Sequence, residues 1–221
     1  MLDIQFKETH DGSKTLYRPD INETYHSIHG ALNESMHVFI KMGLDEFKNQ
    51  NINILEIGFG TGLNALLTLL NKTENQEINY TSLETIPLSD EITNQLEYHT
   101  LIEHPQSKVL FESIHQVDWN KEIEIKKGFW LHKIENSIQE TDLPKNHFDL
   151  IYFDAFAPNK QPELWEIEIF DKMFDILKLN GKLVTYCAKG QVRRNMNESG
   201  FATERLQGPP GKREMLRANK L

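Results

Sequence analysis

Residues 52–64 decide the fold class of this chain and read Ile-Asn-Ile-Leu-Glu-Ile-Gly-Phe-Gly-Thr-Gly-Leu-Asn. Four of the first six residues are isoleucine or leucine, which is typical of a short buried strand. Three alternating glycines follow, and then a leucine-rich, helix-forming run at 63–70. A strand that turns through glycines into a helix places backbone N–H groups at the carboxyl edge of a sheet, where α/β proteins bind nucleotide-like ligands. We therefore predict an α/β domain with a ligand site at this turn.

The spacing of the glycines favours one class of cofactor. A dinucleotide site needs G-x-G-x-x-G, but here the third glycine comes one residue early and Leu63 holds its place. With the preceding glutamate, E-x-G-x-G-x-G resembles motif I of the Rossmann-like class I methyltransferases that use S-adenosylmethionine (SAM). Other nucleotides or a plain tight turn are the alternatives. The resemblance implies that SAM is bound by Glu56, Gly58, Phe59, Gly60, Thr61, Gly62 and Asn64.

Length and composition fit one globular domain. A chain of 221 residues is long enough for a sizeable α/β core, which we assign to residues 51–221 after an N-terminal extension at 1–50. The N-terminus lacks the layout of a signal peptide, and no apolar run approaches the roughly 20 residues that cross a bilayer. Cys187 is the single cysteine, so an internal disulfide is excluded and we expect a buried side chain. We expect a cytoplasmic protein without membrane contact.

Charge is distributed unevenly along the chain. The net charge of −9 argues against a nucleic-acid partner, but residues 182–221 carry nine Lys/Arg against three Glu. This asymmetry predicts a basic face near the C-terminus. A solvated surface that happens to be basic is the alternative.

The segment before the glycine turn has two predicted parts. Residues 4–18 contain Asp-Gly between short apolar runs, which predicts a β-hairpin. Residues 31–40 show helical periodicity. Histidines 26, 29 and 37 lack a fourth ligand at suitable spacing, so we expect no metal site. We expect the polar groups here to shape a substrate entrance.

A second strand is predicted at residues 78–84, and it ends in Glu84. In a doubly wound fold this position, 22 residues after Gly62, suits a carboxylate that binds ribose hydroxyls. The alternative is a surface glutamate at a strand end. The long connection at 85–128 predicts an inserted helical cap. After the next strand, at 128–134, Glu135-Asn136-Ser137 stands where many methyltransferases place the acid that binds adenine. Any of these three side chains can take that role, and we assign Ser137 to the cofactor site.

A further strand, predicted at residues 148–153, leads directly into Asp154-Ala-Phe156. The end of this strand should lie across from the glycine turn. Methyl transfer to an amine needs an in-line lone pair and a group that orients or accepts the proton, which Asp154 can do. Phe156 can stack on a base or pack against the sulfonium cation. A helix cap and a core residue are the alternatives for the pair.

Three separated motifs resemble the methyltransferase half of MnmC, a bifunctional tRNA wobble-uridine modification enzyme. They are Phe-Gly-Thr-Gly-Leu-Asn at 59–64, Asp-Ala-Phe-Ala-Pro through Trp at 154–165, and the block at 190–215. The resemblance implies SAM-dependent methylation of 5-aminomethyl-2-thiouridine at tRNA position 34, with Asp154 and Phe156 as the active-site pair. It implies a stand-alone, MnmD-type monomer without the flavin (FAD) oxidase domain, whose amine is made by a separate FAD-dependent oxidase or by direct aminomethyl formation.

Contacts to substrate follow from the same resemblance and the basic tail. Phosphate contacts would position the anticodon region of the tRNA, and a flipped base would stack near Phe156. The alternatives are a SAM methyltransferase of a small-molecule or protein amine, a nucleotide-binding oxidoreductase, which Leu63 disfavours, and a non-enzymatic binding module. We expect the substrate to be bound by His29, Glu34, Lys160, Arg193, Arg194, Lys212 and Arg213.

Overall fold

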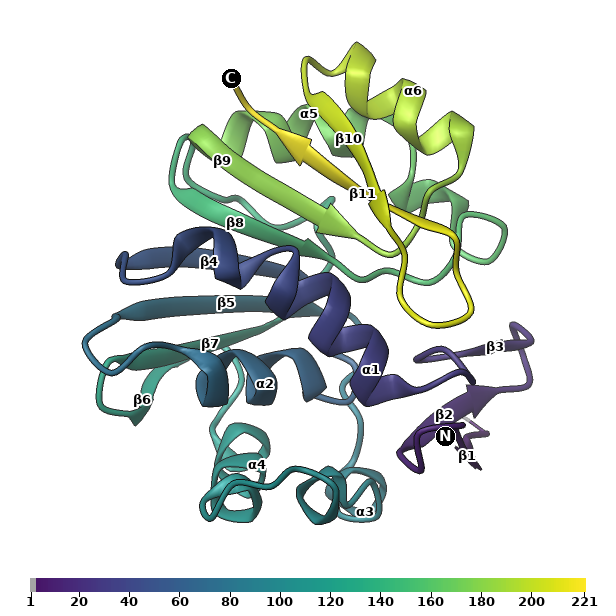
Figure 1. Ribbon diagram of the computed structural model, residues 1–221, viewed down its shortest axis with the longest axis vertical. Helices are drawn as coiled ribbons and strands as arrows, with labels where there is room; N and C mark the ends of the chain where they lie inside the picture. The colour runs from purple at the N-terminus through teal and green to yellow at the C-terminus, as the bar shows by residue number, and fades with distance from the viewer. Residues whose placement is uncertain (1–2) are drawn as a thin grey trace.

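The computed structural model describes residues 3–221 and is built around an eight-stranded sheet of order β10-β11-β9-β8-β4-β5-β7-β6 (Figure 1). The five middle strands are parallel, and the strands at both edges are antiparallel. The chain winds outward from β4 through β5 to β7, and then returns to the other side of β4 with β8 and β9. The strands are β4 (Ile52–Ile57), β5 (Ile78–Glu84), β6 (Glu122–Lys126), β7 (Phe129–Glu135), β8 (Phe148–Phe153), β9 (Leu177–Thr185), β10 (Ala202–Gln207) and β11 (Glu214–Asn219).

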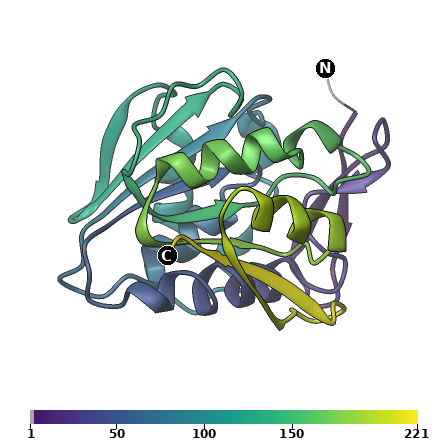
Figure 2. The same cartoon turned by 90° about the horizontal axis from the view of Figure 1, so that it is seen from above.

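Helices cover both faces of this sheet (Figures 1 and 2). Along β8, Leu150 and Tyr152 join the core on one face, while Ile151 and Phe153 join the core on the other. Strands buried on both faces are nearly continuous apolar runs, which is the pattern that predicted them. One face carries α1 (Ala31–Ser35), the π-helix η1 (Met36–Lys41), α2 (Leu63–Asn71) and α4 (Ser107–Gln116), and the other carries α5 (Ile167–Ile176) and α6 (Gly190–Glu198).

The N-terminal hairpin is confirmed, with a third strand added. β1 (Gln5–Glu8), β2 (Lys14–Arg18) and β3 (Glu23–Thr24) form a small antiparallel sheet. Its tight turn contains Gly12 with φ +80°, a conformation that favours glycine. Figure 1 shows this sheet beyond the carboxyl ends of β8 and β9. A small separate sheet therefore stands over the edge where we predicted the ligand site.

The connection between β5 and β7 is only partly helical. It contains α3 (Asp90–Thr93), the short 3₁₀ helix η3 (Tyr98–Thr100) and α4, in line with the predicted cap. Residues 122–126, however, form β6, which pairs antiparallel with β7 at the edge of the sheet. The sequence Glu-Ile-Glu-Ile-Lys alternates with the period of two that an edge strand needs, a signal that the helical interpretation of 85–128 passed over.

Cys187 is buried, as predicted. Within residues 3–221, every helix is too short or too polar to cross a membrane.

Candidate cofactor and substrate site

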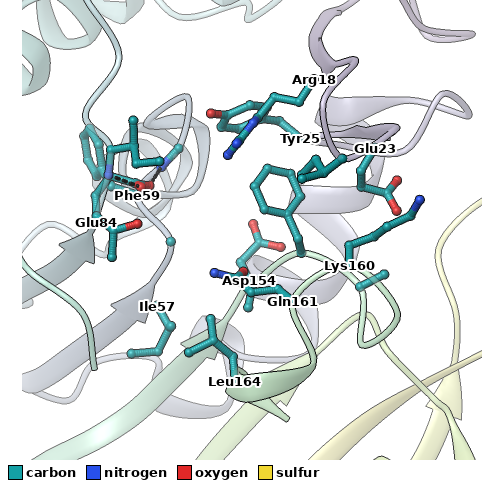
Figure 3. Close-up of a pocket in the computed structure, with 18 of the residues that line it drawn as sticks. Arg18, Glu23, Tyr25, Ile57, Phe59, Glu84, Asp154, Lys160, Gln161 and Leu164 are labelled. Carbon is teal, nitrogen blue, oxygen red and sulfur yellow. Dashed lines mark hydrogen bonds between the residues drawn. The ribbon is translucent and has the colours of Figure 1, made fainter. Parts of the chain in front are cut away.

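A cavity of about 960 Å³ opens at the carboxyl ends of the parallel strands (Figure 3). It lies where β4 and β8 are neighbours, which is the point where the chain reverses its winding direction. Ligands of doubly wound folds bind at this switch point because the loops on either side diverge there. The walls come from the glycine turn, from the loops after β5, β7 and β8, and from the small N-terminal sheet.

The glycine turn packs directly against the end of β8. Gly58 has φ +91°, and a Cβ atom at this position would come 2.8 Å from the carbonyl oxygen of Asp154. Only glycine allows this approach and this backbone angle together. The predicted residues Gly58, Phe59, Gly60 and Thr61 all line the cavity, whereas Gly62 precedes α2 and lies outside the lining.

Glu84 is held rigidly at the end of β5. Its two carboxylate oxygens accept hydrogen bonds from the backbone N–H of Gly60 (2.9 Å) and of Ile86 (3.0 Å). Burial raises the pKa of Glu84, and these hydrogen bonds to the charged form oppose the rise. A carboxylate at this point can accept hydrogen bonds from vicinal hydroxyls. The loop at 136–140, including the predicted Ser137, lines the cavity on the same side.

Asp154 and Phe156 follow β8, as predicted, and both line the cavity. The backbone N–H of Asp154 donates to the carbonyl of Ile57 (3.1 Å), and Asn64 Nδ2 donates to its Oδ2 (2.8 Å). Desolvation raises the pKa of Asp154 to about 7, and the nearby Glu34 carboxylate adds to the rise, while the Asn64 hydrogen bond and the Lys212 ammonium oppose it. A carboxyl group with such a pKa can both accept and release a proton near neutrality.

The N-terminal sheet contributes an aromatic and cationic wall that the sequence analysis missed. The ring of Tyr25 packs edge-on against Phe156 at 5.1 Å between centroids, and the guanidinium of Arg18 lies 5.8 Å from the Phe156 centroid. Figure 3 shows Arg18 and Tyr25 across the cavity from Glu84, with Asp154 below them in this view. Tyr25 falls in the segment expected to shape an entrance, but the local sequence around Arg18 carries no comparable signal.

A partly buried ion pair joins the N-terminal and C-terminal parts of the chain beside Asp154. Lys212, in the loop between β10 and β11, binds the carboxylate of Glu34 at 2.5 Å, and its ammonium lies 3.8 Å from the ring centroid of Tyr186. The second Glu34 oxygen accepts the backbone N–H of Ser27 (2.8 Å). Glu34 and Lys212, both predicted substrate residues, therefore line the cavity as a fixed pair.

Two histidines hold the cofactor turn in place. His26 Nε2 lies 2.7 Å from Thr61 Oγ1, and His115 Nε2 lies 3.2 Å from the carbonyl oxygen of Thr61. Desolvation lowers the pKa of each imidazole to about 4, so both are neutral at physiological pH. The N-terminal segment, through His26, and the helical insertion, through His115, therefore both contact the glycine turn at Thr61.

Three residues predicted to bind the cofactor lie outside the cavity lining: Glu56, Gly62 and Asn64. Glu56 is fully buried behind the turn and accepts a hydrogen bond from Ser82 Oγ (2.7 Å). It sits in the ladder between Ser82 of β5 and Tyr152 of β8, so its carboxyl group belongs to the core. Asn64 points from α2 toward Asp154.

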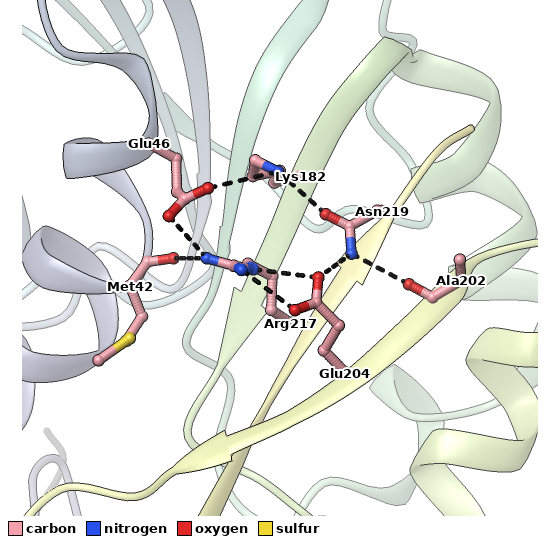
Figure 4. A network of polar contacts seen from close by, with 7 residues as sticks. All are labelled: Met42, Glu46, Lys182, Ala202, Glu204, Arg217 and Asn219. Carbon is pink, nitrogen blue, oxygen red and sulfur yellow. Dashed lines mark hydrogen bonds and ion pairs between the residues drawn. The ribbon is translucent and has the colours of Figure 1, made fainter.

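The basic tail is only partly available to a partner. Arg217 binds Glu46 (3.0 Å) and Glu204 (3.1 Å), and Lys182 also binds Glu46 (3.5 Å), so these charges are paired inside the fold (Figure 4). This network corrects the view of residues 182–221 as one basic face. Of the predicted substrate residues, Glu34, Lys160 and Lys212 line the cavity, whereas His29, Arg193, Arg194 and Arg213 do not.

Comparison with known proteins identifies the family. A family model described as S-adenosyl-L-methionine-dependent methyltransferase matches residues 96–221. The chain belongs to this family. The methyltransferase is 28% identical over 228 residues to the tRNA 5-methylaminomethyl-2-thiouridine biosynthesis bifunctional protein MnmC of Pseudoalteromonas translucida, a match that covers 89% of this chain and 33% of that protein. The chain thus spans about a third of the length of the curated relatives it matches.

Solved structures show the same class I methyltransferase fold. MnmC2 from Aquifex aeolicus superposes with a TM-score of 0.79 at 25% identity, covering 99% of this chain and 70% of that one. Spermidine synthase from Thermotoga maritima superposes with a TM-score of 0.59 at 15% identity over 100% of this chain and 75% of its own, a likeness of fold alone. The predicted Rossmann-like fold and the predicted dependence on SAM are confirmed.

Proposed function

We propose that this methyltransferase transfers a methyl group from SAM to the primary amine of 5-aminomethyl-2-thiouridine at wobble position 34 of tRNA. The observation that carries the proposal is the placement of Asp154 beside Phe156 in a cavity that also contains the glycine turn. The similarity to MnmC and MnmC2 supports this substrate. The product is 5-methylaminomethyl-2-thiouridine.

The residues present fit SAM. The turn at 58–61 lines the cavity, and Glu84 at the end of β5 offers carboxylate oxygens for ribose hydroxyls. In this arrangement, Ser137 and its neighbours in the 136–140 loop would contact the adenine of SAM. When bound, SAM supplies a methyl group on a positively charged sulfur, and methyl transfer to nitrogen leaves a neutral thioether.

Asp154 orients the amine and accepts the proton that the nitrogen loses during methyl transfer. A primary ammonium has no lone pair, so it must first lose one proton to solvent before its nitrogen can form a bond to the methyl carbon. The Asp154 carboxylate accepts a hydrogen bond from the neutral amine, orients its lone pair, and takes the second proton as the N–C bond forms. Positioning in a site that excludes water provides much of the rate.

The wall formed by Phe156, Tyr25 and Arg18 suits a flipped base. Aromatic stacking is worth about 1–3 kcal/mol per base and does not depend on base identity. Lys160 and Lys212 lie near enough to the cavity to help hold the nucleotide. Outside the cavity, His29, Arg193, Arg194 and Arg213 are the side chains that we assign to the tRNA backbone, where contacts position rather than specify.

The substrate amine requires an earlier reaction. A primary aminomethyl group arises either when an oxidase that uses FAD removes a carboxymethyl substituent, or when the aminomethyl group is installed directly. We propose that a separate protein performs this step and that the methyltransferase acts as a monomer in the cytoplasm.

A methylation assay with two substrate pools tests the proposal. The purified protein, with SAM carrying a labelled methyl group, is offered tRNA that contains 5-aminomethyl-2-thiouridine or a panel of free primary amines. We expect label in the wobble nucleoside and none in the free amines. Label in the free amines with unlabelled tRNA would instead support a small-molecule methyltransferase.

A further inference from the structure

Lys133, in strand β7, is a buried lysine beside the glycine turn. Its side chain is 1% exposed, and its Nζ donates a hydrogen bond to the backbone carbonyl of His115 (2.8 Å). The ammonium also lies 4.8 Å from the ring centroid of Trp119 and 5.4 Å from that of Phe59. A buried charge is unfavourable unless its surroundings compensate it. Here the compensation comes from a carbonyl oxygen and two aromatic rings, which attract a cation.

The carbonyl that Lys133 binds lies in the last turn of α4, the longest helix of the insertion. Carbonyl groups in the last turn of a helix have no partner within the helix, and they carry the negative end of its dipole. A lysine that donates to them is therefore favourable. Lys133 thus fixes the end of α4 against strand β7.

The side chain of His115 extends this contact to the turn. Its Nε2 donates to the carbonyl oxygen of Thr61 (3.2 Å). Gly62 has φ +71°, and a Cβ atom there would come 2.9 Å from His115 Nε2 and 3.1 Å from Phe59 Cζ. The rings of His115 and Phe59 pack edge-on, with 5.6 Å between centroids. The end of α4 therefore packs directly against the turn.

We propose that Lys133 is a positioning residue for the cofactor. Its ammonium holds the end of α4, and with it His115, where that end supports the glycine turn. Phe59 and Thr61 line the cavity, so a shift of the turn changes the surface offered to SAM. The inference rests on the proposed binding of SAM at this turn and not on the identity of the methyl acceptor.

Lys133 keeps its charge at neutral pH. Burial lowers the pKa of Lys133 to about 8, and the carboxylates of Asp90 and Asp118 oppose the decrease. His115 adds no competing charge, because burial lowers its pKa to about 4. The ammonium form therefore predominates below pH 8 and maintains the contacts to the carbonyl and to the two rings.

Three substitutions separate positioning from general stability. Lys133→Met keeps a long unbranched side chain but removes the donor and the charge. Lys220→Met is the matched control: Lys220 Nζ also donates to a carbonyl in the last turn of a helix, that of Phe174 in α5 (2.7 Å), and lies 4.6 Å from the Phe174 ring centroid. Lys220 follows β11 and lies outside the cavity lining. His115→Phe keeps a ring but removes the bond to Thr61.

Hydrogen exchange of the free protein is the first measurement, and it needs neither SAM nor tRNA. The N–H of Gly62 donates to the carbonyl of Phe59 (2.8 Å) within the turn and reports on its opening. We expect faster exchange at Gly62 in Lys133→Met and in His115→Phe than in wild type, and an unchanged rate in Lys220→Met. Exchange at the wild-type rate in Lys133→Met would overturn the proposal.

Calorimetry with SAM is the second measurement. We expect Lys133→Met to bind SAM about 10–100-fold more weakly, the range found when outer-shell partners of metal ligands are removed. Lys220→Met should bind SAM as wild type does. Because Lys133 acts through His115, the double variant Lys133→Met/His115→Phe should lose less affinity than the sum of the two single losses in free energy. Thermal unfolding checks that each variant is folded at the temperature of the titration.

Wild-type SAM affinity in a folded Lys133→Met variant would overturn the positioning role, as would an equal loss in Lys220→Met. Additive losses in the double variant would contradict an action through His115. If Lys133→Met does not fold, His115→Phe decides, and wild-type affinity there overturns the proposal. Gly58→Ala separates this failure from that of the SAM site. If Gly58→Ala binds SAM weakly while Lys133→Met binds it normally, SAM remains at the turn and only the role of Lys133 is wrong.

Discussion

Asn64 Nδ2 donates a 2.8 Å hydrogen bond to Oδ2 of Asp154. Asn64 lies in the first turn of the helix that follows the glycine turn, and Asp154 directly follows strand β8. The cofactor turn and the proposed catalytic base are therefore joined by one side-chain contact.

Replacement of Asp154 should abolish methyl transfer without abolishing SAM binding. Asp154→Asn keeps the shape of the side chain and an acceptor for Asn64, but it cannot take up the amine proton. We expect a loss of about 10²–10⁴-fold in single-turnover rate. Calorimetry with SAM is the control, and a variant of unchanged rate would remove Asp154 from the mechanism.

The reaction should depend on pH through Asp154. Its raised pKa of about 7 means that the carboxylate form is populated only as pH rises through that value. We expect kcat/KM to increase with pH and to show a break near 7, followed by a further rise as the free amine loses its proton. If the pH profile of kcat/KM for Asp154→Asn kept the break near 7, the break would belong to another titratable group.

Removing one or the other partner of the Glu34–Lys212 ion pair should shift the pH of this break in opposite directions. The Glu34 carboxylate raises the pKa of Asp154 and the Lys212 ammonium lowers it. The break should therefore move to lower pH in Glu34→Gln and to higher pH in Lys212→Met. Equal shifts in the same direction would indicate a general loss of structure, which circular dichroism of both variants would detect.

Gly58 should tolerate no side chain. An alanine there meets the Asp154 carbonyl at 2.8 Å with φ at +91°, so Gly58→Ala should lower the free energy of unfolding by about 1–3 kcal/mol and weaken SAM binding. Gly190→Ala is the matched control, because it lies in helix α6 with no backbone atom near the added Cβ. Urea denaturation of both variants measures the difference. Similar stabilities would contradict the close packing of the turn.

His26 should make the protein sensitive to acid. Its folded-state pKa of about 4 lies below the usual value of about 6.5, so the unfolded chain binds the proton first as pH falls. The stability that neutral His26 provides is thus fully present above pH 6.5 and is lost as pH falls to about 4. Relative to pH 7.5, wild type should lose about 2–4 kcal/mol more than His26→Gln at pH 4. Parallel stability curves would show that His26 titrates normally.

Sequence patterns located the centre of the site because parallel strands end at one edge of a sheet. Gly58, Glu84 and Asp154 each follow a buried apolar strand, and their proximity follows from that topology. Arg18 and the Tyr25 contact with Phe156 depend on how a separate small sheet docks over the edge, which local patterns do not encode. The motif placed Glu56 at the cofactor, whereas strand pairing places it in the core.

The basic tail shows a second limit of prediction from sequence, which concerns charge. Counting charges along residues 182–221 predicted a face for nucleic acid, but Arg217 and Lys182 pair with Glu46, which lies far away in the sequence. Net charge along a segment does not reveal partners from other segments. Contacts made across the fold decide which cations remain available.

The most direct test of the central claim is mass spectrometry of the wobble nucleosides of tRNA from cells that lack this protein. We predict that 5-aminomethyl-2-thiouridine accumulates and that its methylated product is lost. The wild-type protein should restore the product, whereas Asp154→Asn should not. An unchanged level of 5-methylaminomethyl-2-thiouridine in the deletion strain would contradict the proposed function.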